Sequence, residues 1–329
     1  MTAATDPVDP TGRTAPAASR CSDAARERGD TMVGTAPPAR RWFLVEQNGD
    51  WGRNAWEGLD CYDQAKEELR TRLEAAGARL MLIRRPGARP EPGHPSRRFC
   101  LVDTDQPFPM LWGTARSDGD LVCAAESFRD WPAGAGTGVS AGTDAGAGTG
   151  ASAAPDGAPG IVMVCTHGLK DVCCAVRGRP VAAALAAEWP DAVWECTHTG
   201  GDRFAANVVL LPDGAIYGGT DPETAVADLR AHLAGTVDPT RLRGRCGLTP
   251  PAQASVAAAL RELGPMRWGD VAVFRQSGTE EGWQVELTVR GETVQATGRT
   301  VTTEPHRLTC RAAGPAPMRL PVVESLRAG

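Results

Sequence analysis

The chain lacks the features of several large classes of protein. Its 329 residues include no apolar run of about 18 residues, so no membrane-spanning helix is expected. The formal net charge is −5, which argues against the basic surface of a nucleic-acid-binding domain. The first 20 residues contain no hydrophobic core of the kind found in secretion signals, so we expect a cytoplasmic protein.

Motifs of common enzyme and redox sites are also missing. The sequence has no G-x-x-x-x-G-K-[ST] phosphate loop and no H-E-x-x-H zinc-protease motif. It also has no C-x-x-C pair, which thiol–disulfide oxidoreductases use. We therefore expect a protein without a substrate of its own rather than an enzyme.

Cysteine, in contrast, is frequent, with ten residues. Outside an oxidising compartment such thiols stay reduced or bind metal, so we expect no disulfide framework. Cys173 and Cys196 are predicted to lie in the core or beside a bound group. Five cysteines without any partner pattern are predicted to be structural, namely Cys61, Cys100, Cys123, Cys246 and Cys310.

The predicted elements divide the chain into parts. Residues 1–30 are polar and small, and we expect them to be disordered. Residues 31–132 are predicted to form a small α/β domain. Its expected elements are a strand at 40–46, a helix at 60–76 capped by Asp60, strands at 78–84 and 97–103, and weaker strand candidates at 111–115 and 121–125. Residues 133–160 are rich in Gly and Ala and are predicted to be a flexible linker.

A second domain is predicted over residues 161–249, with the order β-α-β-β-β-α of a thioredoxin-like sandwich. Its expected elements are a strand at 161–164, a helix from Pro180 to 188, a strand at 193–196, a hairpin over 205–217 and a helix capped by Asp221. Residues 250–329 are predicted to add a helix at 250–263, short strands at 271–274, 283–289 and 293–297, and a tail of about ten residues.

Chemistry is concentrated between residues 165 and 202. Cys165-Thr-His-Gly-Leu-Lys-Asp-Val-Cys-Cys174 and Glu195-Cys-Thr-His-Thr-Gly-Gly-Asp202 are separated by one predicted helix and one predicted strand. Thiols, imidazole and carboxylate in two neighbouring loops suit a metal site or a redox-active thiol pair. A structural zinc site stays open as an alternative, although the spacing differs from the usual C-x₂₋₄-C pairs.

Four stretches of the chain resemble the sucrase/ferredoxin-like family, and the resemblance covers roughly residues 20–250. They are Gly34–Gln47, Cys165–Ala175, Gly178–Pro180 and His198–Val208. The resemblance implies a thioredoxin-like ferredoxin with a [2Fe–2S] cluster, an electron carrier that works with a redox partner protein of unknown identity. It leaves open whether the N-terminal domain is thioredoxin-like as well, and we expect that domain to bind a partner or to stabilise the protein.

The same resemblance implies the cluster ligands. Characterised members use two Cys from the first loop and two His from an H-x-G-G-H motif in the second. In this sequence these positions are Cys165, Cys174, His198 and Asp202, so an aspartate stands in place of the second histidine. Cys196, His167 or water are the alternatives for the fourth ligand. Three arginines are expected either to stabilise an anionic cluster from nearby or to be solvated, namely Arg177, Arg179 and Arg203.

Overall fold

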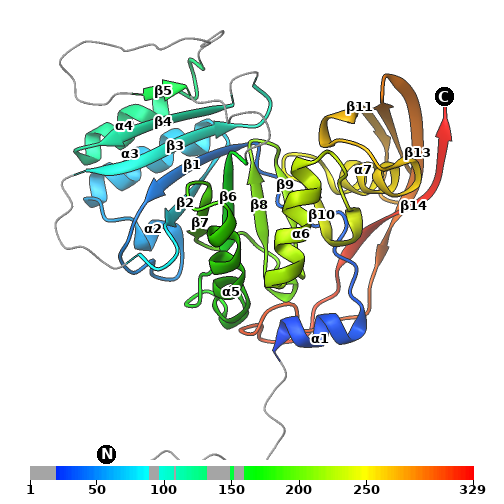
Figure 1. Ribbon diagram of the computed structural model, residues 1–329, viewed down its shortest axis with the longest axis horizontal. Helices are drawn as coiled ribbons and strands as arrows, with labels where there is room; N and C mark the ends of the chain where they lie inside the picture. The colour runs from blue at the N-terminus through cyan, green and yellow to red at the C-terminus, as the bar shows by residue number, and fades with distance from the viewer. Residues whose placement is uncertain (1–19, 89–95, 107–108, 132–148, 152–158) are drawn as a thin grey trace, which may run out of the picture.

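The computed structural model describes residues 20–88, 96–106, 109–131, 149–151 and 159–329 (Figure 1). The protein is mixed α/β, as predicted, with two sheets in the described residues. The larger sheet has ten strands in the order β10-β9-β8-β6-β7-β2-β1-β3-β4-β5, and the smaller is the antiparallel sheet β11-β12-β13-β14.

The elements of the described residues have the following bounds. The strands are β1 (Arg41–Glu46), β2 (Ala78–Arg84), β3 (Arg97–Asp103), β4 (Met110–Ala115), β5 (Thr149–Ala151), β6 (Ile161–Cys165), β7 (Val193–Cys196), β8 (Val208–Leu211), β9 (Ala215–Tyr217), β10 (Leu242–Arg245), β11 (Val271–Gly278), β12 (Trp283–Val289), β13 (Glu292–Thr302) and β14 (Arg319–Ala328). The helices are α1 (Cys21–Arg28), α2 (Ala55–Gly58), α3 (Asp63–Ala75), α4 (Asp118–Glu126), α5 (Val172–Glu188), α6 (Pro222–Leu233) and α7 (Pro250–Leu263), with short 3₁₀ helices η1 (Asp202–Phe204), η2 (Pro239–Arg241) and η3 (Trp268–Asp270).

The larger sheet contains the same arrangement twice. In the first half, β1 pairs in parallel with β2 and antiparallel with β3, which continues to β4. In the second half, β6 pairs in parallel with β7 and antiparallel with β8, which continues to β9. A helix connects the two parallel strands in each half, α3 in the first and α5 in the second, and another helix follows the fourth strand. The two halves therefore share one order of elements.

Strands β2 and β7 join the two halves into one sheet. They pair antiparallel, with Ile83 opposite Cys196. Both side chains belong to one buried cluster that also contains Trp42 and Trp194 from the two halves. Residues 31–132 and 161–249 therefore share a hydrophobic core in addition to their own.

Several predicted elements have other bounds or another type. The helix expected from Asp60 begins at Asp63 instead, after Tyr62. The weak strand candidate at 121–125 is wrong, because these residues lie in helix α4. The side chain of Ser117 accepts a hydrogen bond from the Asp120 N–H and the Asp120 carboxylate accepts one from the Ser117 N–H, which is a capping box that starts a helix.

The helix predicted to begin at Pro180 begins eight residues earlier, at Val172. Asp171 caps it, since its carboxylate accepts a hydrogen bond from the Cys173 N–H at 2.9 Å. Pro180 therefore lies inside α5, where it removes one backbone hydrogen bond. The longer helix matters for the chemistry, because its first turn carries both Cys173 and Cys174.

The predicted disorder of residues 1–30 is wrong for Cys21–Arg28, which form α1 with Cys21 and Ala25 buried. Polar composition alone could not show the tertiary contacts that hold this helix. The predicted C-terminal tail is also wrong, because Arg319–Ala328 form β14 alongside β13. Residues 1–19 and most of the predicted linker, 132–148 and 152–158, lie outside the described residues.

The C-terminal region packs on the second half of the larger sheet. Trp283 and Leu287 of β12 share a buried cluster with Val181 of α5 and Leu229 of α6. No helix in the described part of the chain is both long enough and apolar enough to cross a membrane.

Candidate metal-binding sites

Three predicted ligands meet at one end of the second half of the larger sheet. Cys165 is the last residue of β6, Cys174 lies in the first turn of α5, and His198 follows β7. Because β6 and β7 are parallel, their carboxyl ends lie side by side and bring the two loops together. The Sγ atoms of Cys165 and Cys174 and a ring nitrogen of His198 all lie within 4.8 Å of one another.

Asp202, the fourth predicted ligand, lies against two of these three residues. Its Oδ1 is 3.3 Å from the Sγ of Cys174 and 3.1 Å from Nδ1 of His198. The side chain is only 4% exposed, and burial raises the pKa of its carboxyl group to about 6. All four predicted ligands are therefore adjacent, two of them thiols with almost no solvent contact.

The two thiols of this site shift each other's pKa. Their side-chain interaction lowers the pKa of Cys165 and raises that of Cys174. The backbone N–H of Thr199 also donates to the Cys165 sulfur and His198 lies nearby, and both contacts lower its pKa further, against the effect of burial. A lowered pKa favours the thiolate, which is the form of cysteine that reacts and binds metals.

The loop that carries His198 and Asp202 depends on two glycines. Gly200 and Gly201 have φ angles of +98° and +79°, a region that residues with a Cβ rarely adopt. A Cβ on Gly201 would also lie 2.6 Å from the guanidinium of Arg243. The Gly-Gly pair of the sequence motif thus allows the chain to turn back between the two ligands.

Arg243 of β10 stabilises this loop through hydrogen bonds. The side chain is buried, and its guanidinium donates to the carbonyl of Gly200 and to Oδ1 of Asn207, both at 2.8 Å. It also donates to the hydroxyl and the carbonyl oxygen of Thr35. Burial lowers the pKa of Arg243 to about 9, so it stays charged at neutral pH and places a positive charge close to Cys165 and Asp202.

Replacing Arg243 by methionine should lower the free energy of unfolding by about 3 kcal/mol, because four acceptors lose their buried donor. Urea denaturation of the two proteins would measure the difference. Arg275→Met is the control, since that side chain is 71% exposed and its nearest carboxylate is 3.9 Å away. If the free energy of unfolding of Arg243→Met differed from that of the parent protein by less than about 0.5 kcal/mol, the loop would not depend on this residue.

Two further residues hold the backbone of His198. Arg79 of β2 donates to the carbonyl oxygens of His198 and Thr199, at 2.6 and 3.2 Å. His167 accepts at Nδ1 from the His198 N–H at 3.2 Å, and its Nε2 donates to the carbonyl of Gly52 at 2.9 Å. Both nitrogens of His167 are thus engaged, so it positions His198 rather than competing for the fourth ligand position.

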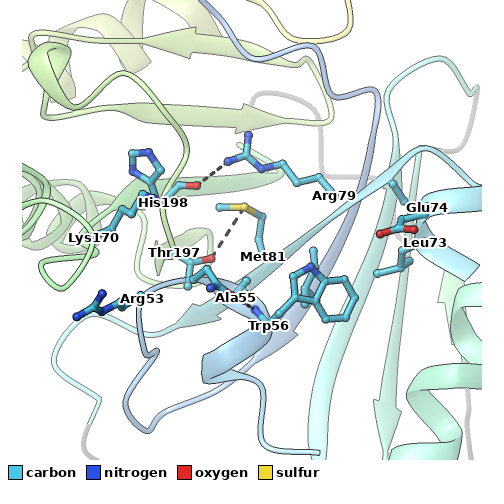
Figure 2. A pocket seen from close by; sticks show the side chains of 13 residues that line it. Arg53, Ala55, Trp56, Leu73, Glu74, Arg79, Met81, Lys170, Thr197 and His198 are labelled. Atoms are coloured by element: carbon cyan, nitrogen blue, oxygen red, sulfur yellow. Dashed lines mark hydrogen bonds between the residues drawn. The ribbon is translucent and has the colours of Figure 1, made fainter. Parts of the chain in front are cut away.

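A cavity of about 440 Å³ gives solvent access to His198 (Figure 2). It lies between the His198 loop and the first half of the protein, whose lining residues include Arg53, Trp56 and Arg79. Figure 2 shows Arg79 reaching the carbonyl of His198, and Lys170 also lines the cavity. The His198 side chain is 21% exposed, so it is the predicted ligand through which the site reaches the surface.

The residues present fit a metal or an iron–sulfur cluster. Two thiols, one imidazole and one carboxylate are ligands that both zinc and iron accept. The hydroxyls of Thr166 and Thr199, each next to a predicted ligand in the chain, are buried without a hydrogen-bond partner among the described residues. Because a buried unpaired hydroxyl is costly, these two groups are suited to donate to a bound group with acceptor sulfur.

Comparison with known proteins identifies the family of the chain. The sucrase/ferredoxin-like family matches residues 32–244, well over half of the chain. The chain belongs to the sucrase/ferredoxin-like family. Neither the curated proteins nor the solved structures contain a match to it.

Of the three arginines that the sequence suggested, Arg203 follows Asp202 in this sucrase/ferredoxin-like chain and interacts with that aspartate electrostatically. Arg177 pairs with Asp23 and donates to the hydroxyl of Ser22 at 2.9 Å. Arg203 lies over the ring of Phe204 at 4.2 Å, and Arg179 is exposed. Arg79 and Arg243, in contrast, donate hydrogen bonds to the ligand loop. Sequence reasoning missed both, because they lie on strands β2 and β10, far from the motifs in the chain.

A second group of metal-ligating side chains lies on the other side of the start of α5. Cys21, Cys173 and Cys310 converge there with Asp171, and all four offer ligand atoms within 4.8 Å of one another. Cys173 and Cys174 are adjacent in the helix, and their side chains point to different groups. The sequence predicts a disordered segment around Cys21 and a structural role for Cys310, and neither prediction indicates this group. Two isolated cysteines 289 residues apart give no local signal.

Proposed function

We propose that this protein is an electron carrier that holds a [2Fe–2S] cluster with Cys165, Cys174, His198 and Asp202. The observation that carries the proposal is the convergence of these four side chains from two loops, two of them buried thiols. Family membership supports it. The strand order β7-β6-β8-β9, with α5 between the parallel strands and α6 after β9, supports a thioredoxin-like fold for this half, and the first half has the same order.

The bound cluster would supply one-electron redox chemistry at a potential set by its ligands and their surroundings. Cys165 and Cys174 would supply the thiolates, and Asp202 and His198 the oxygen and nitrogen ligands. Arg243 and Arg79 hold the loop of the second pair, and their charges offset negative charge at the centre. His198 lies at the cavity, so a partner protein would exchange electrons from that side. The proposal includes a cytoplasmic location, where thiols stay reduced.

A single zinc ion is the second candidate for this site. Donor atoms within 4.8 Å of one another are close to the spacing around one tetrahedral ion, whose sulfur ligands lie about 2.3 Å from the metal. Two irons bridged by sulfide need more room. To make room for two irons, the chain would move at the Gly200–Gly201 turn, because glycine has the widest backbone freedom. Metal content and redox behaviour separate the two candidates.

Reversible bleaching tests the proposed function. The purified protein should lose its visible absorption on addition of dithionite and regain it on reoxidation. Replacing Asp202 by histidine should retain the cluster and raise its reduction potential by on the order of 100 mV, because a neutral imidazole replaces a carboxylate. A redox titration of both proteins would measure this change. An unchanged potential would show that Asp202 is not a ligand, and a colourless protein that binds only zinc would overturn the electron-carrier function.

A further inference from the structure

Three thiols from distant parts of the chain form a compact triangle at the start of α5. The Sγ atoms of Cys21 and Cys173 are 3.6 Å apart, those of Cys173 and Cys310 are 3.3 Å apart, and those of Cys310 and Cys21 are 3.5 Å apart. Cys21 and Cys173 are buried and Cys310 is half-buried. Three nearly equal separations are unusual for cysteines that merely fill space.

A fourth donor completes this group. Asp171 is fully buried, and its Oδ2 lies 4.0 Å from the Sγ of Cys21. The same oxygen accepts a hydrogen bond from the Cys310 N–H at 2.7 Å, and Oδ1 accepts from the Cys173 N–H at 2.9 Å. The carboxylate is thus held in place by the backbone of two of the three cysteines, which fixes it next to the thiols.

The geometry points to a second, structural metal site, in which one zinc ion is bound by Cys21, Cys173, Cys310 and Asp171. In tetrahedral coordination, with zinc–sulfur bonds of about 2.3 Å, the sulfur atoms lie about 3.8 Å apart. The observed triangle of 3.3 to 3.6 Å needs to widen only slightly to admit the ion. Binding displaces the thiol protons, so the site needs no oxidant or reductant.

A disulfide explains this arrangement less well. Bonded sulfur atoms lie about 2.05 Å apart, and any one bond would leave the third thiol unpaired in the same site. Without a metal, the three neighbouring thiols would also compete with one another for the few hydrogen-bond donors around them.

The electrostatic surroundings favour thiolates at this site. The two helices α1 and α5 begin here, with Cys21 and Cys173 in their first turns, and helix N-termini favour thiolates. Arg203 adds a positive charge near Cys21.

The zinc site would join three segments that are far apart in the chain. These segments are the N-terminal helix α1, the first turn of α5, and the loop before β14 that contains Cys310. The first turn of α5 also carries Cys174, so the zinc site would fix the position of that ligand from the opposite side. This inference does not depend on the proposed iron–sulfur site, because the two groups share no residue.

Metal analysis of variants tests the inference. The double variant Cys165→Ser/Cys174→Ser removes the first site, and after purification with zinc under reducing conditions it should still contain about one zinc per chain. Adding Cys310→Ser should lower the zinc content at least fivefold, whereas adding Cys61→Ser, another half-buried cysteine, should leave it unchanged. Circular dichroism would confirm that each variant is folded.

Three results would overturn the inference. They are a double variant without zinc, a zinc content that is indifferent to Cys310→Ser, and a disulfide between two of the three cysteines detected by mass spectrometry of the native protein. If the double variant does not fold, the single variant Cys310→Ser in the otherwise unchanged protein decides the question. It should contain about one zinc fewer per chain than the parent protein and keep the metal of the first site, and an unchanged zinc content would contradict the inference.

Discussion

Replacing Cys174 by serine should remove essentially all iron and acid-labile sulfide from the protein. The Cys174 sulfur is one of two buried thiols at the proposed cluster and contacts both Cys165 and Asp202. A neutral hydroxyl is a poor replacement for a thiolate ligand to iron. Iron and sulfide assays on the purified variant, together with the visible spectrum, would measure the loss.

The neighbouring residue offers a closely matched control. Cys173 is also fully buried and lies in the same helical turn, but its side chain faces Cys21 and Cys310 instead. Cys173→Ser should therefore keep most of the iron and lose the zinc that we infer for the second site. If both variants lost iron equally, the effect would reflect a damaged helix rather than a lost ligand, and the assignment of Cys174 would fail.

Replacing Gly178 by alanine should have the second large effect. Gly178 lies in α5, where the helix passes against the end of β6, and an added Cβ would be only 2.1 Å from the carbonyl oxygen of Cys165. That atom belongs to the backbone of a central strand, so the helix has to move away. We expect a loss of about 1–3 kcal/mol in the free energy of unfolding. We also expect a reduced iron content, because the shift separates Cys165 from Cys174.

Gly119→Ala is the control for this prediction. Gly119 lies in α4, and the nearest atom to its added Cβ would be the Ser117 hydroxyl at 3.7 Å. Alanine is the better helix former, so this change should be neutral or slightly stabilising. Urea denaturation and iron content would be measured for both variants. A Gly178→Ala protein as stable and as rich in iron as the parent would show that this contact does not position the ligands.

Local sequence patterns predicted several strands and helices closely. The strands at 78–84 and 97–103 and the helix at 250–263 have the predicted bounds. The helix after Asp221 has the predicted cap. These elements have clear apolar periodicity and strong end signals. The start of α5 was misplaced, because Pro180 gives a helix-start signal although the Asp171 cap lies earlier in the chain.

The site was only partly predictable from the sequence, because some of its contacts form only in the folded chain. The four proposed ligands lie in two short motifs, and the structure brings those motifs together as the sequence suggested. Arg79 and Arg243 act through contacts made only in the folded chain. The cluster of Cys21, Cys173 and Cys310 likewise depends on tertiary structure, because it joins a helix near the N-terminus to a loop near the C-terminus.

The most direct test of the electron-carrier function is the metal and sulfide content of protein purified without oxygen. A [2Fe–2S] cluster predicts a red-brown protein that absorbs between about 400 and 600 nm, with about two iron and two acid-labile sulfide per chain. When iron and sulfide show that the first site holds the cluster, zinc measured on the same sample reports on the second site. A colourless protein that contains no iron or sulfide after an attempt at cluster reconstitution would contradict the function proposed for Cys165, Cys174, His198 and Asp202.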